Sequence, residues 1–271
     1  MADARSSRPT VEELLAYDLA VCAWMQEGGD GEIPFEDPPA LPDHKTPTVE
    51  AAGQLALEGI GEAESRARLR LAGFDEAGSG ALAGPVVVGC VHFPPSSLLG
   101  SGSVRLFDAL RGVGDSKQVP PRRREALYDR IVEHAVCGVG ASPACEIDRI
   151  GIVAASGRAA TRALLQLGAR VDAGLFDRGL SLHPVEGAGR PVGPETVATA
   201  TRADGRSLHV AAASILAKVT RDRFMVALAE RFPGFGLETH KGYGTLVHRE
   251  AIDASGASPI HRRTFLHHRP G

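Results

Sequence analysis

The stretch Leu71-Ala-Gly-Phe-Asp75-Glu76-Ala-Gly78-Ser79-Gly80 decides how the chain is organised. An apolar, strand-like run ends there in two adjacent carboxylates, and a glycine-rich turn and a second strand-like run follow. Because adjacent side chains on a regular strand point to opposite faces, Asp75 and Glu76 can act together only if the strand breaks at this point. We expect Gly78 and Gly80 to allow that break. Paired carboxylates beside exposed backbone amides suit a hard divalent cation and a phosphate group.

Two other interpretations of this stretch stay open. Most carboxylates lie at the protein surface, so the pair could simply begin a solvated turn. The spacing Gly78-x-Gly80-x-x-x-Gly84 is close to the dinucleotide-binding fingerprint but misses it by one residue. Two carboxylates would also repel a pyrophosphate unless a metal ion lay between them. Metal-dependent chemistry is the better functional interpretation, and it requires further acidic ligands elsewhere in the chain.

The composition indicates a globular protein of a reducing compartment. The 271 residues suffice for one large or two small domains, and an apolar content of 43% allows a sizeable core. The four cysteines show no Cys-x-x-Cys spacing, which disfavours a disulfide framework or a structural zinc site. The chain opens with no secretory leader pattern, and no apolar run approaches the ~18 residues that a membrane span needs. We therefore expect a soluble, cytoplasmic protein without a membrane partner, acting as a monomer.

The net charge of −3 conceals an asymmetry along the chain. Residues 1–70 hold six Lys or Arg against 14 Asp or Glu, whereas residues 71–271 hold 24 against 19. If several acidic residues of the second part bind metal, its outer surface is more basic than this balance suggests. A mildly basic catalytic part is compatible with a polyanionic partner, although the excess alone is unremarkable.

Strand-like and helix-like segments alternate, which predicts an α/β fold with helices on the faces of a sheet. We expect an N-terminal extension over 1–69, a catalytic domain over 70–231 and a C-terminal substrate-binding part over 232–271. The Gly- and Pro-rich stretch within the extension is typical of a linker, and we expect residues 1–45 to be dispensable for the chemistry. The predicted strands are 70–75, 84–93, 135–141, 171–177 and 195–201, and the predicted helices are 11–26, 48–66, 121–134, 146–168, 206–231 and 246–254.

Two further aspartates stand where a metal site would require them. Asp177 ends an apolar, strand-like run, and Asp204 lies just before the long predicted helix. Functional groups gather at strand ends in open α/β sheets, and four carboxylates there would hold two divalent metal ions. Each aspartate taken alone is more often a turn residue or a helix cap, so the prediction depends on the whole set.

Basic and hydroxyl side chains elsewhere could bind phosphates. Ser214, Lys218 and Arg221 share one helix face, which by default would be solvated. Lys117 lies in a loop before a helix whose first turn carries Arg122, Arg123 and Arg124, and a partner's phosphates would explain these arginines better than helix stability does. Lys241 and Tyr243 combine a cation and an aromatic ring in a turn, which suits a sugar-phosphate. His240 and His248 fit no zinc spacing.

Five motifs in order resemble type 2 ribonuclease H (ribonuclease HII) across residues 70–267. They are Asp75-Glu-Ala-Gly-Ser-Gly-Ala-Leu-Ala-Gly-Pro85, Asp115-Ser-Lys117, Ala213-Ser-Ile-Leu-Ala-Lys-Val-Thr-Arg-Asp222, His240-Lys-Gly-Tyr-Gly-Thr245 and Ser258-Pro-Ile-His-Arg-Arg-Thr-Phe265. The resemblance implies a ribonuclease-H-like mixed sheet of five strands flanked by helices, with a C-terminal helical part that closes on the substrate. It also implies hydrolysis of the RNA strand of RNA–DNA hybrids, and cutting at ribonucleotides embedded in a DNA duplex, with Mg²⁺ or Mn²⁺, to give 3′-hydroxyl and 5′-phosphate ends.

Carried over by motif, the resemblance assigns the roles of individual residues. It implies that four acidic side chains bind two metal ions: Asp75, Glu76, Asp177 and Asp204. The loop that senses the ribose 2′-hydroxyl falls on Gly78, Ser79 and Gly80. Tyr243 takes the place of the tyrosine that packs on the sugar at the RNA-to-DNA step. Further contacts to the nucleic acid are expected from Lys117, Ser214, Lys218 and Lys241.

Two departures from the family pattern bear on function. Ser79 stands where the family has a basic residue, so a cationic contact is lost while the backbone amides survive. Arg178 separates Asp177 from Gly179, whereas the family has glycine directly after its third acidic residue. The alternative is therefore a catalytically impaired hybrid-binding protein of the same fold. Retention of all four acidic residues favours the enzyme.

Overall fold

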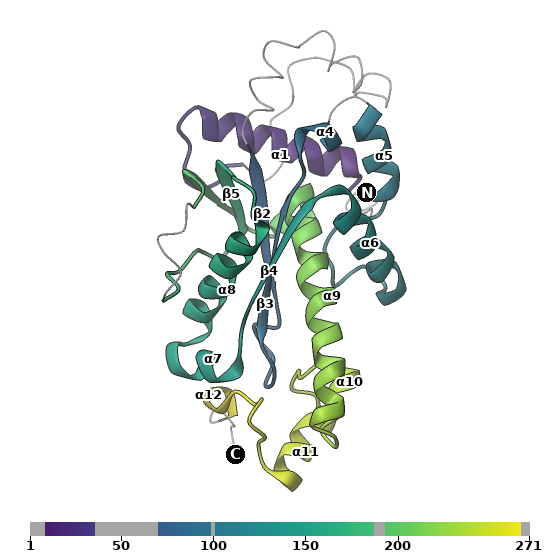
Figure 1. The fold of residues 1–271 in the computed structure, drawn as a ribbon, viewed down its shortest axis with the longest axis vertical. Coiled ribbons are helices and arrows are strands. Elements are labelled where there is room, and N and C mark those ends of the chain that lie inside the picture. Colours follow the sequence, from purple (N-terminus) through teal and green to yellow (C-terminus); the bar gives the residue numbers. More distant parts are fainter. Residues whose placement is uncertain (1–8, 36–69, 99–100, 187–192, 267–271) are drawn as a thin grey trace, which may run out of the picture.

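The structure is a computed structural model that describes residues 9–35, 70–98, 101–186 and 193–266 (Figure 1). It confirms a mixed α/β fold, but the sheet has six strands rather than the expected five. The strands lie in the order β1-β6-β5-β2-β3-β4. The sixth strand is β1, which the sequence analysis assigned to a linker. The strands are β1 Gly31–Glu32, β2 Leu71–Ala77, β3 Val86–His92, β4 Val136–Ser142, β5 Ala173–Asp177 and β6 Thr196–Ala200.

The sheet has an antiparallel half and a parallel half that share β2. Strand β2 pairs antiparallel with β3, and β3 pairs antiparallel with β4. On its other side β2 pairs parallel with β5, followed by β6 and β1. Carboxyl ends of neighbouring parallel strands meet at one edge, so β2, β5 and β6 all deliver their last residues to the same place.

Helices cover both faces of the sheet (Figure 1). The bounds of α1, α6, α9 and α11 lie within two residues of the expected ranges, whereas α4, α5, α10 and α12 were not expected. On one face α8 packs on β3 and β4, and on the other α9 packs on β2 and β3. Glycines allow the close approach: a Cβ at Gly89 would meet the backbone of α9, and one at Gly138 would meet that of α8. The helices are α1 Val11–Gln26, α4 Pro95–Leu98, α5 Ser101–Ala109, α6 Pro121–His134, α7 Ala144–Ile150, α8 Ile152–Leu167, α9 Leu208–Arg231, α10 Leu237–His240, α11 Leu246–Ser255 and α12 Arg263–Leu266.

Two predicted elements differ in the structure. The single helix expected over 146–168 is divided into α7 and α8, because Gly151 adopts φ +80 and ends the first helix. The break expected at Asp75 and Glu76 is absent, because β2 continues to Ala77. Both carboxylates nevertheless lie close enough to Asp177 for its charge to add to the rise that burial causes in their pKa, so their acting together does not require a break in the strand. The helix expected over 48–66 lies outside the described residues.

Helix α1 belongs to the folded core, and the expectation that residues 1–45 are dispensable for the chemistry stays a prediction. A capping box formed by Thr10 and Glu13 begins the helix. Its apolar residues join two core clusters, with Leu14 beside α9 and Val21 beside β5 and β6. Asp18 is buried against α9, where its Oδ2 accepts hydrogen bonds from the His209 ring nitrogen Nδ1 (2.7 Å) and backbone N–H (3.2 Å). No helix among the described residues is both long and apolar enough to cross a membrane.

Candidate active site

The four acidic residues of the predicted metal site come from adjacent elements at one edge of the sheet. Asp75 and Glu76 lie near the end of β2, and Asp177 is the last residue of β5, its parallel neighbour. Asp204 lies in the short 3-10 helix Ala203–Gly205 that connects β6 to α9. The parallel pairing of Phe74 with Phe176 places the two strand ends side by side.

A backbone hydrogen bond connects the third and fourth carboxylates. Asp177 Oδ1 accepts a hydrogen bond from the Ala203 N–H at 2.9 Å, which anchors the 3-10 helix that carries Asp204. The inserted Arg178 leaves Asp177 at the end of β5, because its backbone N–H pairs with the Ala200 carbonyl at 3.0 Å. Asp172 lies before β5 and is engaged there by Arg70, at 2.6 Å, so it is held at the opposite end of that strand.

Burial and mutual repulsion destabilise the charged forms of these carboxylates. Burial raises the pKa of Asp75 well above its usual value, and the charges of Glu76, Asp204 and Asp177 raise it further. Burial, together with Asp115 and Asp177, raises the pKa of Asp204 to about 6. Asp115 was not among the predicted site residues, although its Asp-Ser-Lys motif was the signal that could have identified it.

A divalent cation fits the chemistry of this donor set. Carboxylate oxygens are the preferred ligands of Mg²⁺ and Mn²⁺, and a dication would offset the repulsion that raises these pKa values. In the part of the chain that the structure describes, no three His, Cys, Asp or Glu side chains are grouped so that they could hold a metal ion as they stand. The carboxylates are thus neighbours on one edge but are not closed around a common point.

The glycine loop, residues 78–85, connects β2 to β3 and lies next to the carboxylates. Gly78 adopts φ +90, a conformation that favours glycine, and a Cβ there would meet the Arg221 side chain. Gly78 is buried, Ser79 is half-buried and Gly80 is exposed. The loop thus emerges from the core at Ser79 and presents Gly80 to solvent.

Tyr243 lies beside the glycine loop because Gly242 binds that loop directly. The Gly242 carbonyl accepts hydrogen bonds from the amides of Leu82 (2.8 Å) and Ala83 (3.2 Å). The Tyr243 side chain is 36% exposed, and its ring centroid lies 5.6 Å from Lys218 Nζ. Two segments that are far apart in the chain are therefore joined at one surface.

Basic side chains from α6, from α9 and from the turn after α10 line a groove beside Tyr243: Arg124, Lys218, Arg223 and Lys241. That Lys218 and Lys241 contact nucleic acid stays a prediction. Acidic partners share the groove: Lys218 Nζ lies 2.8 Å from Asp222. Burial and the charge of Asp177 raise the pKa of Glu76, and the charge of the exposed Lys117 nearby offsets part of that rise.

Several predicted phosphate contacts are buried instead. The helix face of Ser214, Lys218 and Arg221 is not solvated, because Arg221 is fully buried and Ser214 donates a hydrogen bond to Ser116 Oγ at 2.9 Å. Ser214 also lies beside Asp75, where it offsets part of the rise that burial causes in the pKa of that carboxyl. Arg124 donates to the backbone carbonyls of the loop before α6, including that of Ser116 at 2.9 Å. It therefore has a structural partner, contrary to the expectation for the arginines of this helix.

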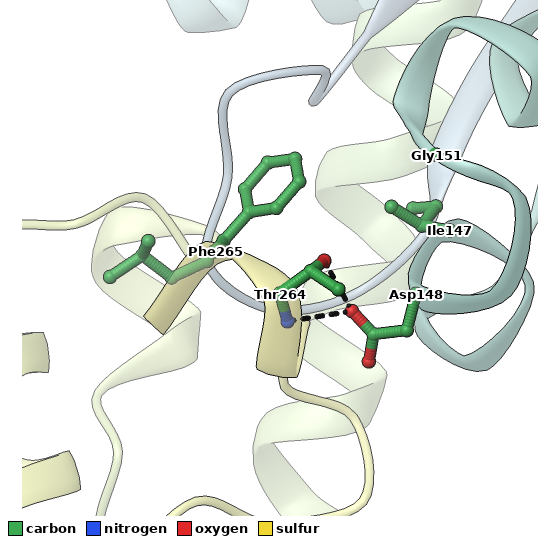
Figure 2. A pocket seen from close by; sticks show the side chains of 6 residues that line it. Ile147, Asp148, Gly151, Thr264 and Phe265 are labelled. Atoms are coloured by element: carbon green, nitrogen blue, oxygen red, sulfur yellow. Dashed lines mark hydrogen bonds between the residues drawn. The ribbon is translucent and has the colours of Figure 1, made fainter. Parts of the chain in front are cut away.

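The C-terminal motif forms two structures that the sequence analysis did not assign. His248 donates from Nδ1 to the Tyr243 carbonyl at 2.9 Å, and its Nε2 lies 3.1 Å from Nε2 of His261. Figure 2 shows Asp148 of α7 pointing toward Thr264 of α12, beside a pocket that Ile147 and Phe265 help to line. Asp148 Oδ1 accepts hydrogen bonds from the Thr264 N–H (3.0 Å) and hydroxyl (2.7 Å), which fastens α12 to α7.

Comparisons with known proteins point to one family. The family model described as Ribonuclease HII matches residues 72–268. A ribonuclease HII of Chloroflexus aurantiacus is 45% identical over 207 residues, covering 74% of this chain and 89% of the relative. One of Thermus thermophilus is 43% identical over 201 residues, covering 74% and 88%. Helix α1 and strand β1 lie outside the match to the family model.

Solved structures share the fold. The ribonuclease H2 from Pyrococcus horikoshii OT3 superposes with a TM-score of 0.54 at 28% identity, covering 72% of this chain and 93% of that one. RNase HII in its complex with PCNA from Archaeoglobus fulgidus has a TM-score of 0.56 at 29% identity, covering 72% and 94%. Bst-RNase HIII in complex with Mn²⁺ is 23% identical with a TM-score of 0.53, covering 83% and 71%, and it shares the fold.

Proposed function

The chain belongs to the ribonuclease HII family and is an endoribonuclease that cleaves the RNA of RNA–DNA hybrids and ribonucleotides embedded in DNA, and we propose that the sheet-edge carboxylates form its catalytic centre. The observation that carries this assignment is the convergence of Asp75, Glu76, Asp177 and Asp204 on one edge, beside the glycine loop and Tyr243. We further propose two divalent ions, Mg²⁺ or Mn²⁺, as the cofactors, and a monomeric, cytoplasmic enzyme.

In this proposal the carboxylates supply oxygen ligands and Asp177 also fixes Asp204 through the 3-10 helix. Bound divalent metal would lower the pKa of a water molecule and stabilise the charge on the leaving 3′-oxygen. Without that positive charge, the clustered carboxylates would repel both one another and the phosphate of a substrate. Metal binding and substrate binding are therefore expected to be coupled.

The remaining residues orient the substrate. Backbone amides of the glycine loop recognise the 2′-hydroxyl, which distinguishes RNA from DNA at a given position. Tyr243 packs on the neighbouring deoxyribose, and Lys117, Lys218 and Lys241 contact phosphates. Ser79 offers no cation to the substrate, so recognition by this loop depends on its backbone. The role of Ser214 in binding nucleic acid stays a prediction, since its hydroxyl is engaged by Ser116.

The first prediction tests the catalytic centre through Asp75→Asn. An amide is neutral and a poor replacement for a metal-ligating carboxylate, so cleavage of a DNA duplex with one ribonucleotide should fall by more than a hundredfold in either metal. Burial already opposes a charge at Asp75, so the thermal unfolding midpoint should stay the same or rise.

The matched control is Asp172→Asn, which makes the same Asp-to-Asn change away from the proposed metal site. Asp172 precedes the start of β5, whereas Asp177 of the proposed site ends that strand. It should cleave normally and be slightly less stable, because it loses its ion pair with Arg70. Cleavage by Asp75→Asn within a few-fold of the wild type would contradict the assignment of the metal site.

A further inference from the structure

Arg262 lies beneath the glycine loop and binds three of its carbonyl groups. Its side chain is fully buried. Nη2 donates to the Gly78 carbonyl at 2.7 Å, Nη1 to the Ser79 carbonyl at 2.8 Å and Nε to the Gly84 carbonyl at 3.0 Å. A planar guanidinium can make these three bonds at once because its donors are fixed in a rigid fork.

These bonds determine the direction of two amide groups. A trans peptide unit is planar, and its N–H points opposite to its C=O. The carbonyls of Gly78 and Ser79 point inward to Arg262, so the N–H groups of Ser79 and Gly80 point away from it. Because Ser79 is half-buried and Gly80 is exposed, the two amides face the outer side of the loop. Positive charge at the carbonyl end of a peptide unit also strengthens its N–H as a donor.

The rest of the fold holds Arg262 in this place. The Arg262 N–H donates to the Leu82 carbonyl at 2.8 Å, and the next residues, Arg263 and Thr264, are fastened to Asp148 through their own N–H groups. A second buried arginine, Arg221, supports the far end of the loop by donating to the Pro85 carbonyl at 2.9 Å. Carbonyl groups of the loop therefore accept hydrogen bonds from two buried guanidinium groups, those of Arg262 and Arg221.

We propose that Arg262 is a positioning residue for ribose recognition, which holds two peptide units of the glycine loop so that the Ser79 and Gly80 amides can donate to the 2′-hydroxyl. The proposal rests on the proposed function of this loop. Ser79 at the centre of the loop offers no cation, and the proposal provides the Ser79 and Gly80 amides as fixed donors in its place. The proposal also gives a function to Arg262 within the motif Ser258-Pro-Ile-His-Arg-Arg-Thr-Phe265.

The test measures discrimination between ribose and deoxyribose rather than activity alone. In an Asp75→Asn background, which blocks cleavage, fluorescence anisotropy gives Kd for a duplex with one ribonucleotide and for the same duplex made of DNA. Arg262→Lys keeps the charge and loses the fork, and Arg262→Gln loses both. Each should reduce the preference for the ribonucleotide by about tenfold, the effect expected for two misaligned hydrogen bonds. The affinity for the all-DNA duplex should stay within about twofold.

The control is Arg263→Gln, because Arg263 is the adjacent arginine and its side chain is exposed. It should keep the full preference. If neither Arg262 variant folds, Asp148→Ala decides the matter, because it releases the segment that holds Arg262 without touching the loop; the preference should again fall.

Three results would count against the proposal or its premise, and each is distinct. An unchanged preference in a folded Arg262 variant, or in Asp148→Ala when that variant has to decide, overturns the proposal. An equal loss of affinity for both duplexes also overturns it, because that result reflects general damage to the surface. A background protein with Arg262 intact that shows no preference at all would instead remove the premise that this loop recognises ribose.

Discussion

Tyr243 is held in place by neighbouring residues for which we propose no contact with the substrate. Its carbonyl is held by His248, and its neighbour Gly242 is bonded to the loop after β2. We predict that Tyr243→Ala lowers cleavage at a single embedded ribonucleotide by about tenfold or more, by analogy with aromatic stacking on bases, which is worth roughly 1–3 kcal/mol. The Tyr243 residue is 36% exposed and its ring centroid lies 5.3 Å from the Arg221 guanidinium carbon, so we expect its loss to lower the thermal unfolding midpoint by a few degrees. Tyr243→Phe keeps the ring and should cleave normally. An equal loss on a continuous RNA–DNA hybrid would argue for simple packing instead of a role at the junction.

The sequence predicted helix α1 but not its packing against the core. In Figure 1 the helix lies across the upper end of the sheet, close to the start of α9. Its apolar side chains share a core cluster with Ala203 of the 3-10 helix that carries Asp204, and its buried Asp18 accepts hydrogen bonds from His209 of α9. We predict that Asp18→Ala lowers the free energy of unfolding by about 2–4 kcal/mol, because the ring and backbone N–H of His209 would lose their buried acceptor. Glu12→Ala, an exposed acid on the same helix, should cost less than about 0.5 kcal/mol. Urea unfolding of the two variants gives the comparison. Similar stability of the two, or of a protein lacking residues 1–45, would show that α1 contributes little to the core.

At the scale of the whole molecule, the C-terminal segment returns to the loop after β2 and makes stability depend on pH. His261 pairs with Ala83 in an isolated bridge, and its Nδ1 accepts the Ser258 N–H at 3.0 Å, which requires a neutral ring. Burial and His248 lower the pKa of His261 to about 4. Below about pH 6.5 the His261 ring is protonated in the unfolded chain but stays neutral in the folded chain. The free energy of unfolding therefore falls as the pH falls toward 4. Between pH 7 and pH 5 the loss is about 2 kcal/mol. The difference in unfolding free energy between wild type and His261→Asn should therefore shrink by that amount; a constant difference would contradict the prediction.

Local patterns were sufficient wherever a residue's environment depends on its near neighbours. Helix α6 has the predicted bounds, and the strands lie within a few residues of their expected places, because apolar periodicity and turn residues act over short distances. The carboxylates of the candidate site could be proposed from strand ends and motif spacing. The break expected at Asp75 and Glu76 was wrong, because antiparallel pairing with Gly89 and Val88 of β3 keeps β2 extended through these residues.

What the sequence alone determined is the order of the elements, the acidic residues at strand ends and the family to which the motifs point. Only the tertiary structure decided the sixth strand, the burial of Arg221 and Ser214, and the placing of Arg262 beneath a loop that lies far earlier in the chain. An arginine in a sequence carries no sign of whether water or backbone carbonyls will solvate it. That choice depends on which distant segments pack around it, and long-range packing is the information that local spacing does not contain.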